Sequence, residues 1–326
     1  METFVLDDSE VAEHAHTPAL VSAVEDAFAA YATGAVEMPA KSYVEPDAYG
    51  GDFRSMPAYV DADGWDAAGV KWVSVYPDNP EAHGLPTVLG LVIYSDPATG
   101  FPLAVMDGTE LTMRRTGAAA AVATDHLAVD DATSMGIVGA GVQSYAQLEA
   151  VSTVRPIGEV VVSDPDDERV DRFVEAFEDE FTVRSGDVGA AAACDVLSTV
   201  TPVEDPIVTA ADLGERTHVN AVGADAPGKR ELADGVVEAA KLVIDDHEQC
   251  THSGEINVPW TEGTLDAADV HGELGEIVTG RLDGRVSADG VTVFDSTGLA
   301  IQDVAAARIV YEAARDDGAD AYDFLS

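Results

Sequence analysis

The sequence predicts an α/β protein with a doubly wound parallel sheet and, before it, a smaller α+β sheet domain. From residue 134 to about residue 243, short apolar runs alternate with stretches of helical periodicity, the pattern of a parallel sheet with crossover helices. Before residue 108, strand-like runs follow one another with one helix among them. The 326 residues, 46% of them hydrophobic, are enough for two domains with proper cores.

A glycine pair at the start of the parallel region is typical of dinucleotide binding. The apolar run Met135–Gly139 is strand-like, Gly141 follows, and Val142 begins a stretch with helical spacing. Gly139 permits a sharp turn, and Gly141 allows the backbone to approach a pyrophosphate at the helix N-terminus. Ser144 stands where the fingerprint has a third small residue, Gly or Ala, so the match is incomplete. With its flanking strand and helix, the pair predicts a Rossmann domain.

An acidic residue follows the second strand of this region at the distance expected for NAD. Residues 159–164 are strand-like, and Asp164 lies 23 residues after Gly141. A carboxylate at this point accepts hydrogen bonds from the adenosine ribose hydroxyls. The acidic residues at 166–168 would repel a 2′-phosphate, so NAD is favoured over NADP. A solvated acidic loop is the alternative interpretation.

The N-terminal region is expected to form one helix and a sheet. Residues 17–32 carry apolar side chains at helical spacing after a Thr-Pro start. A turn-rich connection is expected from Pro77 to Pro86, and a helix from Leu111 to Leu127 should link the domains. Strands are expected at residues 41–44, 53–56, 70–76, 88–94 and 101–106.

The parallel region and the C-terminal end complete the expected elements. Residues 292–298 are expected to form a strand and then a turn, and residues 299–314 an apolar-faced helix. The strands of the parallel sheet are expected at residues 135–139, 159–164, 195–199, 217–222 and 242–244.

The charge of the chain is its most unusual property. It has 61 acidic and 17 basic residues, and the formal net charge of −44 is spread along its length. Such a surface suits concentrated salt, where repulsion is screened over about 3 Å in roughly 1 M salt, and indicates a halophilic cytosol. It argues against nucleic-acid or anionic-membrane partners, which require basic patches.

The expected location is the cytoplasm. Two cysteines, Cys194 and Cys250, are too few for a disulfide framework and fit a reducing compartment. No signal-like segment opens the sequence and no apolar run approaches 18 residues. These features favour a soluble intracellular protein.

Two residues are candidates for proton transfer. Lys71 lies among apolar residues of an alternating strand, where a lysine is costly unless it is paired or used, and where its pKa can fall. The alternative is a solvent-facing lysine on an edge strand. Asp225 lies in a glycine-rich turn at the carboxyl end of a parallel strand, where ligands bind, although a turn-forming aspartate is equally consistent. Together, Lys71 and Asp225 could handle the protons of an amino-acid to imino-acid oxidation.

Six motifs in the same order resemble the ornithine cyclodeaminase/mu-crystallin family over nearly the whole chain. They are Arg-Ser-Met-Pro-Ala-Tyr at 54–59, Gly-Val-Lys at 69–71, Leu-Thr at 111–112 with Arg-Thr at 115–116, Gly-Ala-Gly-Val-Gln at 139–143, Gly-Ala-Asp at 223–225 with Gly-Lys at 228–229, and the run at 295–303. The resemblance implies an NAD-binding Rossmann domain of residues 116–299. It also implies a substrate-binding domain of residues 1–115, joined by a C-terminal helix of about residues 300–326. The active site would lie between the domains, and the N-terminal sheet would form a homodimer.

The resemblance also assigns the site residues. Lys71 and Asp225 match the catalytic positions, and Arg115 matches an arginine that holds the substrate carboxylate, a role that suits its planar fork. Lys41 and Arg54 would be further substrate contacts, with Lys41 standing where many members have arginine. The positions implied for NAD are Thr116, Gly139, Ala140, Gly141, Val142, Gln143, Asp164, Thr199, Val222 and Ser296.

Arg54 bears on the substrate. In ornithine cyclodeaminases a glutamate at this position receives the terminal ammonium of the substrate, whereas a cation would repel it. The resemblance, which extends to archaeal L-alanine dehydrogenases, therefore implies NAD-dependent conversion of a small amino acid, alanine, to the oxo acid pyruvate and ammonia.

Other readings stay open at this point. They are ornithine cyclodeamination, reduction of a cyclic ketimine, and non-enzymatic binding, although Lys71, Asp225 and Arg115 together favour an enzyme. His83 in the 77–86 connection could overhang the pocket. No metal site is expected, because the spacing of His247, Glu248, Cys250 and His252 matches no standard zinc pattern.

Overall fold

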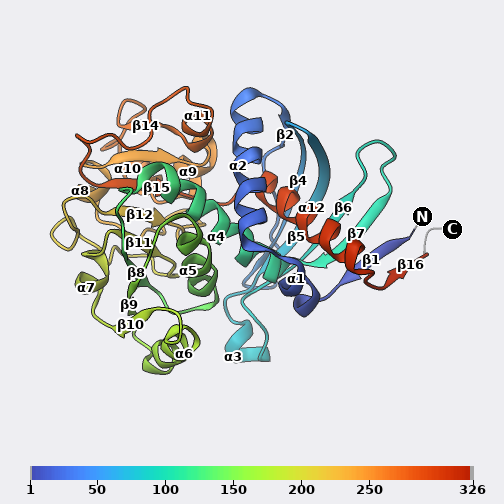
Figure 1. Cartoon of the computed structure of the whole chain (residues 1–326), viewed down its shortest axis with the longest axis horizontal. Helices are drawn as coiled ribbons and strands as arrows, with labels where there is room; N and C mark the ends of the chain where they lie inside the picture. Colours follow the sequence, from blue (N-terminus) through green and yellow to red (C-terminus); the bar gives the residue numbers. More distant parts are fainter. Residues whose placement is uncertain (1, 324–326) are drawn as a thin grey trace. The chain divides into compact units, whose positions relative to one another are not determined.

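The computed structural model describes residues 2–323, which divide into two compact units, each built on its own sheet (Figure 1). Unit 1 contains the described residues up to Arg115 and those from Leu299 onward, and unit 2 is Thr116–Gly298. The chain passes from unit 1 to unit 2 within helix α4 (Gly108–Leu127). No helix in residues 2–323 is both long enough and apolar enough to cross a membrane.

Unit 1 has a mixed sheet with the strand order β16-β1-β7-β6-β5-β4-β2, and β3 also pairs with β4. Only the β1–β7 pairing is parallel. The strands are β1 (Thr3–Leu6), β2 (Val36–Glu37), β3 (Ser42–Val44), β4 (Asp52–Ala62), β5 (Trp65–Val75), β6 (Val88–Ser95), β7 (Pro102–Asp107) and β16 (Ala321–Tyr322). The helices are α1 (Asp8–His14), α2 (Thr17–Thr33), α3 (Asn79–His83) and α12 (Ala300–Asp317).

Helices cover one face of this sheet. Within unit 1, Figure 1 shows α2 in blue and α12 in red against the strands, and α12 contacts β4, β5 and β6. Because side chains of a strand alternate between faces, Lys71 and Val73 of β5 are buried on the helical side, whereas Trp72 points away and is 46% exposed. Leu91 and Ile93 of β6 are exposed too, so the outer face of the sheet is apolar.

Unit 2 has an all-parallel sheet with the order β10-β9-β8-β11-β12-β15-β13-β14. The order reverses direction between β8 and β11, which is where such sheets bind ligands. The strands are β8 (Ser134–Val138), β9 (Glu159–Ser163), β10 (Thr182–Ser185), β11 (Val196–Thr199), β12 (His218–Ala221), β13 (Lys241–Ile244), β14 (Val270–Glu273) and β15 (Thr292–Asp295). The helices after α4 are α5 (Val142–Val154), α6 (Asp167–Phe177), α7 (Val188–Ala192), α8 (Asp234–Val237), α9 (His247–Ser253), α10 (Asn257–Glu262) and α11 (Leu274–Val278).

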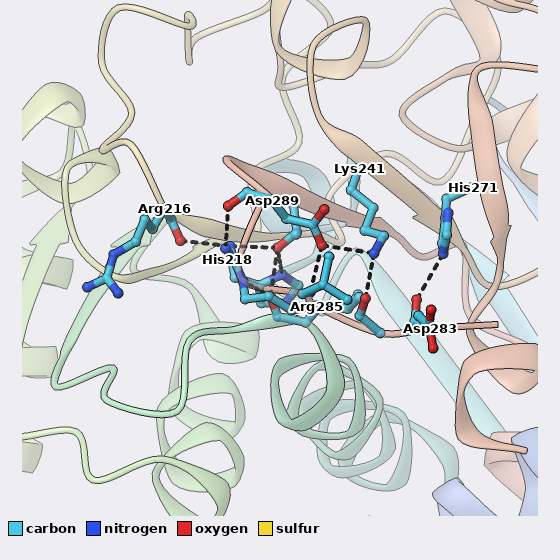
Figure 2. A network of polar contacts seen from close by, with 11 residues as sticks. Arg216, His218, Lys241, His271, Asp283, Arg285 and Asp289 are labelled. Atoms are coloured by element: carbon cyan, nitrogen blue, oxygen red, sulfur yellow. Dashed lines mark hydrogen bonds and ion pairs between the residues drawn. The ribbon is translucent and has the colours of Figure 1, made fainter. Parts of the chain in front are cut away.

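A polar network links the amino ends of β12, β13 and β15 to neighbouring loops (Figure 2). Arg285 donates from Nε to the Leu127 carbonyl at 2.6 Å and from Nη2 to the Arg216 carbonyl at 2.8 Å. Lys241 pairs with Asp289 at 2.8 Å. His218 contacts the Thr292 hydroxyl at 2.9 Å, and burial lowers the pKa of its imidazole to about 3. His218 is therefore a neutral structural residue at physiological pH.

The predicted fold class is confirmed, while several elements differ in extent. The expected turn-rich connection from Pro77 to Pro86 contains α3, which has Pro80 in its first turn and ends at Gly84, with φ of +65°. Strands β4 and β5 are longer than expected, because Pro57 and the polar residues near their shared turn obscure the strand pattern. The short strands β1, β10 and β14 were not predicted.

Candidate active site

Lys71 lies where β5 is paired on both sides, and its side chain points into the core of unit 1. Its backbone pairs with Met56 of β4 and Val92 of β6, and its side chain is only 3% exposed. The Nζ atom lies 2.9 Å from Oδ1 and 2.8 Å from Oδ2 of Asp303 on α12. It also donates to the Thr112 hydroxyl of α4 at 3.2 Å. The alternative of a solvent-facing lysine on an edge strand is therefore wrong.

Arg115 shares the same carboxylate. Its Nε donates to Oδ1 of Asp303 at 3.0 Å, and its Nη1 donates to Oε1 of Gln302 at 2.8 Å. All three side chains are buried. Two cations from β5 and α4 thus meet one anion from the first turn of α12, where the helix dipole favours a negative charge.

The environment of Lys71 moves the pKa of its ammonium group toward neutral pH. Burial is the largest influence and lowers the pKa of the ammonium to about 8. Asp303 opposes this change by stabilising the charged form, whereas the nearby Arg115 and Lys41 lower the pKa further. A lysine with this pKa exists in both protonation states near neutral pH, which suits it to proton transfer.

The other two predicted substrate contacts also lie in unit 1. Arg54 of β4 donates to both oxygens of Asp52, from Nε at 2.7 Å and from Nη2 at 3.1 Å. Its guanidinium carbon lies 5.6 Å from the centre of the Tyr43 ring. Lys41 precedes β3 and acts electrostatically on Lys71. His83 is exposed at the end of α3, so its role stays an open expectation.

In unit 2, the glycine turn between β8 and α5 has the geometry that a dinucleotide requires. Gly139 has φ of +100°, and a Cβ there would lie 2.9 Å from the Val200 carbonyl oxygen. A Cβ on Gly141 would face open space, and no side chain caps α5 at this residue. Val142 is 69% exposed. The turn therefore leaves the backbone at the start of a 13-residue helix approachable by a phosphate.

Asp164 lies directly beside this turn. One carboxylate oxygen accepts from the Ala140 amide at 2.7 Å, and the other accepts from the Asp166 amide at 2.9 Å. The residue is half-buried at the end of β9. Ser144, the imperfect third position, is buried and donates its hydroxyl to the Gly141 carbonyl at 2.6 Å, so it supports the turn in its own way. These residues fit a dinucleotide.

Buried carboxylates hold the loops at the carboxyl ends of β11 and β12. Glu231 accepts from the amide and hydroxyl of Thr201, each at 2.7 Å, and from the Gly223 amide at 3.0 Å. The first loop follows Thr199, and the second carries Val222 and Asp225. Asp225 pairs with Lys229 at 2.9 Å and its side chain is 39% exposed.

Three more carboxylates continue this arrangement toward β15. Glu255 accepts from the Glu231 amide at 2.9 Å, and Asp295 accepts from the Glu255 amide at 2.9 Å. Asp245 accepts from the Ser296 hydroxyl at 3.1 Å and from the amides of residues 297 and 298 at 2.7 and 2.9 Å. Burial raises the pKa of Asp295 to about 7 and that of Glu255 well above its usual value.

The comparison with known proteins adds to this geometry. A model of the ornithine cyclodeaminase/mu-crystallin family matches residues 1–318. The chain belongs to this family. It is 46% identical over 313 residues to an alanine dehydrogenase of Archaeoglobus fulgidus, which covers 96% of this chain and 95% of that protein.

Two solved structures resemble the whole chain. An archaeal alanine dehydrogenase dimer with bound NAD has a TM-score of 0.93 and 45% identity, with both chains fully covered. The Δ1-pyrroline-2-carboxylate reductase of Thermococcus litoralis, in complex with NADH and L-proline, has a TM-score of 0.92 and 36% identity, covering 97% of this chain and 99% of that one.

For this member of the ornithine cyclodeaminase/mu-crystallin family, the structure adds residues that were not predicted as site residues. Asp303 and Thr112 contact Lys71, and Gln302 contacts Arg115. A signal existed for Asp303, because it ends the 295–303 motif and a buried lysine needs a counter-ion. Glu231 and Asp245 carried no signal, since acidic residues are abundant throughout the chain.

The residues once considered for a metal have other contacts. His247 packs its ring edge-on against Trp260, with the centroids 5.0 Å apart, and buried Cys250 donates to Asp245. Within residues 2–323, no group of three His, Cys, Asp or Glu side chains suits a metal ion.

Proposed function

We propose that this chain is an NAD-dependent L-alanine dehydrogenase that converts alanine, NAD⁺ and water to pyruvate, ammonium, NADH and a proton, and that also runs in reverse. The observation that carries the proposal is the buried cluster of Lys71, Arg115 and Asp303 in a chain 46% identical to an alanine dehydrogenase. Such a cluster offers a titrating amine beside a guanidinium fork, the two groups that amino-acid oxidation needs.

NAD is the proposed cofactor, as in the related structures with bound NAD or NADH. The glycine turn at 139–143 and the start of α5 would hold the pyrophosphate, and Asp164 the adenosine ribose. The remaining proposed contacts are Thr116, Thr199, Val222 and Ser296. When bound, NAD⁺ would accept the hydride that leaves the substrate α-carbon.

Unit 1 supplies the proposed substrate contacts. Arg115 would bind the alanine carboxylate, with Lys41 and Arg54 contributing further positive charge. Lys71 would exchange a proton with the substrate, first at its nitrogen and then at the oxygen that becomes the pyruvate carbonyl. With a pKa of about 8, the amine can give or take this proton near neutral pH.

Asp225 is the proposed general base for the water that adds to the imine. Its side chain is 39% exposed and therefore accessible to solvent. The loop that carries it is held by the hydrogen bond from the Gly223 amide to Glu231. Removal of a proton from water lets the oxygen bond to the imine carbon, after which ammonia leaves.

Two activities known among relatives are the competing candidates. Cyclic ketimine reduction is favoured by the 36% identity to a Δ1-pyrroline-2-carboxylate reductase. Ornithine cyclodeamination is disfavoured by Arg54, although Asp52 neutralises part of that charge and reduces the repulsion of a second ammonium. Alanine therefore stands as the proposed substrate.

The test is a substrate comparison with the intact protein in concentrated salt. NADH formation should follow addition of L-alanine with NAD⁺, and NADH consumption should follow pyruvate with ammonium. Proline formed from L-ornithine without net NADH would replace the proposal with cyclodeamination. Fast NADH oxidation by Δ1-pyrroline-2-carboxylate, without activity on alanine, would replace it with ketimine reduction.

A homodimer is also proposed. The outer face of the unit 1 sheet exposes Trp72, Leu89, Leu91 and Ile93, and apolar residues gathered in this way favour burial against a partner. The related archaeal alanine dehydrogenase is a dimer. Light scattering should give the mass of two chains, and Leu91→Glu should yield monomers.

The setting proposed for this enzyme is the cytoplasm of a halophile. The excess of 61 acidic over 17 basic residues supports it, as does the fact that both cysteines are free and buried. The same charge disfavours nucleic-acid and anionic-membrane partners. The melting temperature should rise with salt into the molar range, and equal stability in dilute buffer would contradict the proposal.

A further inference from the structure

We propose that Asp303 is a positioning residue of the active site, whose carboxylate fixes the charge and orientation of Lys71 and Arg115 together. The inference rests on the proposed function for the roles of Lys71 and Arg115. It adds a residue from the C-terminal helix through which those two groups act as one unit.

The geometry gives Asp303 two ionic hydrogen bonds and one further ion-pair contact. Both of its oxygens lie within 2.9 Å of the Lys71 Nζ, and Oδ1 also accepts from the Arg115 Nε at 3.0 Å. The carboxylate is fully buried, so water does not compete for these bonds. One anion therefore sets the separation between the amine and the guanidinium.

The surroundings of Lys71 make this anion decisive. The charged groups that act on the amine are Asp303 from α12, Arg115 from α4 and Lys41 from the segment before β3. Its other contact, Thr112, is neutral, and its strand neighbours Met56 and Val92 are apolar. Without the carboxylate, a buried amine would face only positive charge, and its protonated form would lose its stabilising partner.

Arg115 depends on the same helix turn. Asp303 binds its Nε, and the adjacent Gln302 binds its Nη1, so two neighbouring residues of α12 fix the guanidinium plane. A change at Asp303 should therefore affect two properties together: the protonation of Lys71 and the binding of a substrate carboxylate by Arg115. A residue that only stabilises the fold would change neither one in a folded variant.

The chain permits a direct measurement, because it contains only four lysines, at positions 41, 71, 229 and 241. Protein labelled with ¹³C at the lysine ε-carbon should give four NMR signals, and Lys71→Arg identifies the Lys71 signal by its loss. Titration then gives the pKa of Lys71 without any substrate, so the result does not depend on the proposed function.

In the unchanged protein the Lys71 signal should titrate near pH 8. In Asp303→Asn the midpoint should fall by about 1–3 units, since an opposite charge at this distance accounts for a shift of that size. The acid limb of kcat/KM for alanine should move down with it, and KM should rise. Asp303→Glu, which restores the charge, should return the midpoint toward that of the unchanged protein.

Asp289→Asn is the matched control, because Asp289 pairs with Lys241 at 2.8 Å in unit 2. It should move the Lys241 signal and leave that of Lys71 in place. Circular dichroism verifies folding, and Asp303→Ser, smaller and equally neutral, replaces the Asn variant if that variant does not fold.

A folded, neutral variant whose Lys71 midpoint equals that of the unchanged protein would overturn the inference. An altered midpoint in a protein that never acts on alanine would leave the role of Asp303 at Lys71 intact and refute the proposed function instead. The two proposals can therefore fail separately.

Discussion

Each unit of this protein buries a group of charges, and the two groups are stabilised in opposite ways. In unit 1, the cations of Lys71 and Arg115 share the carboxylate of Asp303. In unit 2, buried carboxylates such as Glu231 and Asp295 receive backbone amides. The first group pairs side chains with one another and includes Lys71, whose amine can exchange a proton, whereas the second fixes loops through hydrogen bonds from the main chain. Burial of charge by itself therefore does not mark a catalytic group; the kind of partner does.

The direction of the pKa changes follows from the sign of each buried charge. Burial disfavours charge in both units, so it lowers the pKa of Lys71 to about 8 and raises that of Asp295 to about 7. Both values fall near neutral pH, but only Lys71 belongs to a cluster proposed to contact substrate. Substitutions in the two regions should therefore have different consequences.

The largest effect is expected from Lys71→Ala. Loss of the proposed proton-transfer group should lower kcat by about 10²–10⁴-fold, while NAD binding, which is proposed for unit 2, should persist. Enzyme assays measure turnover, and quenching of protein fluorescence by NADH measures cofactor binding. Asp225→Ala should likewise lose turnover and keep NAD binding. Full turnover in either variant would refute the assigned role.

A smaller effect on activity, but a clear one on stability, is expected from Glu231→Gln. The carboxylate accepts from Thr201 and Gly223, and a glutamine would direct an NH₂ group at one of these donors. Leaving a buried donor without an acceptor costs about 1–3 kcal/mol, which chemical denaturation measures. Because the loop that carries Asp225 loses an anchor, kcat should fall as well.

The matched control is Glu238→Gln, in which the residue follows α8 in the same unit and is exposed. It should change the free energy of unfolding by less than about 0.5 kcal/mol. Equal effects of the two substitutions would mean that Glu231 does not hold the loops.

The sequence revealed the cluster around Lys71 and the glycine turn of unit 2 far better than the buried carboxylates of unit 2. Lys71 was visible because lysine is rare in this chain and this one interrupts an apolar strand. The glycine turn was visible because positive φ and close backbone approach demand glycine at defined spacing. Arg115 was placed by its motif alone.

The buried carboxylates could not be predicted, because burial depends on tertiary packing. With 61 acidic residues, Glu231 and Asp245 have the same local pattern as acids on the surface. They accept hydrogen bonds from backbone amides in loops distant in sequence, such as those of Thr201 and Gly298. No local spacing encodes these pairings. Short strands such as β10 and β14 were missed for a related reason, since their exposed or half-buried edge positions lack a continuous apolar run.

The free energy of unfolding should depend on pH through the buried carboxylate of Asp295. The pKa of Asp295 is about 7 in the folded protein and 3.8 in the reference state, so the folded state binds this proton more tightly. Its contribution to stability is therefore complete below pH 3.8 and is lost as the pH rises through about 7. The slope from one such proton is at most about 1.4 kcal/mol per pH unit.

Urea unfolding of the native protein and of Asp295→Asn between pH 5 and 8 measures this contribution. The difference in unfolding free energy between the two proteins should change across that range in favour of the variant as the pH rises. Parallel curves would show that Asp295 keeps one charge state throughout.

The smallest effect is expected from Ser296→Ala, and it distinguishes main-chain from side-chain anchoring. Asp245 would lose the Ser296 hydroxyl but keep the amides of Thr297 and Gly298. One hydrogen bond of this kind contributes about 0.5–1.5 kcal/mol, so the loop should stay in place. Ser253→Ala, which removes a buried hydroxyl that donates to Gln249 within α9, provides the control for stability. If Ser296 also contacts the nicotinamide end of NAD, its variant alone should raise KM for NAD, because Ser253 is not among the proposed cofactor contacts.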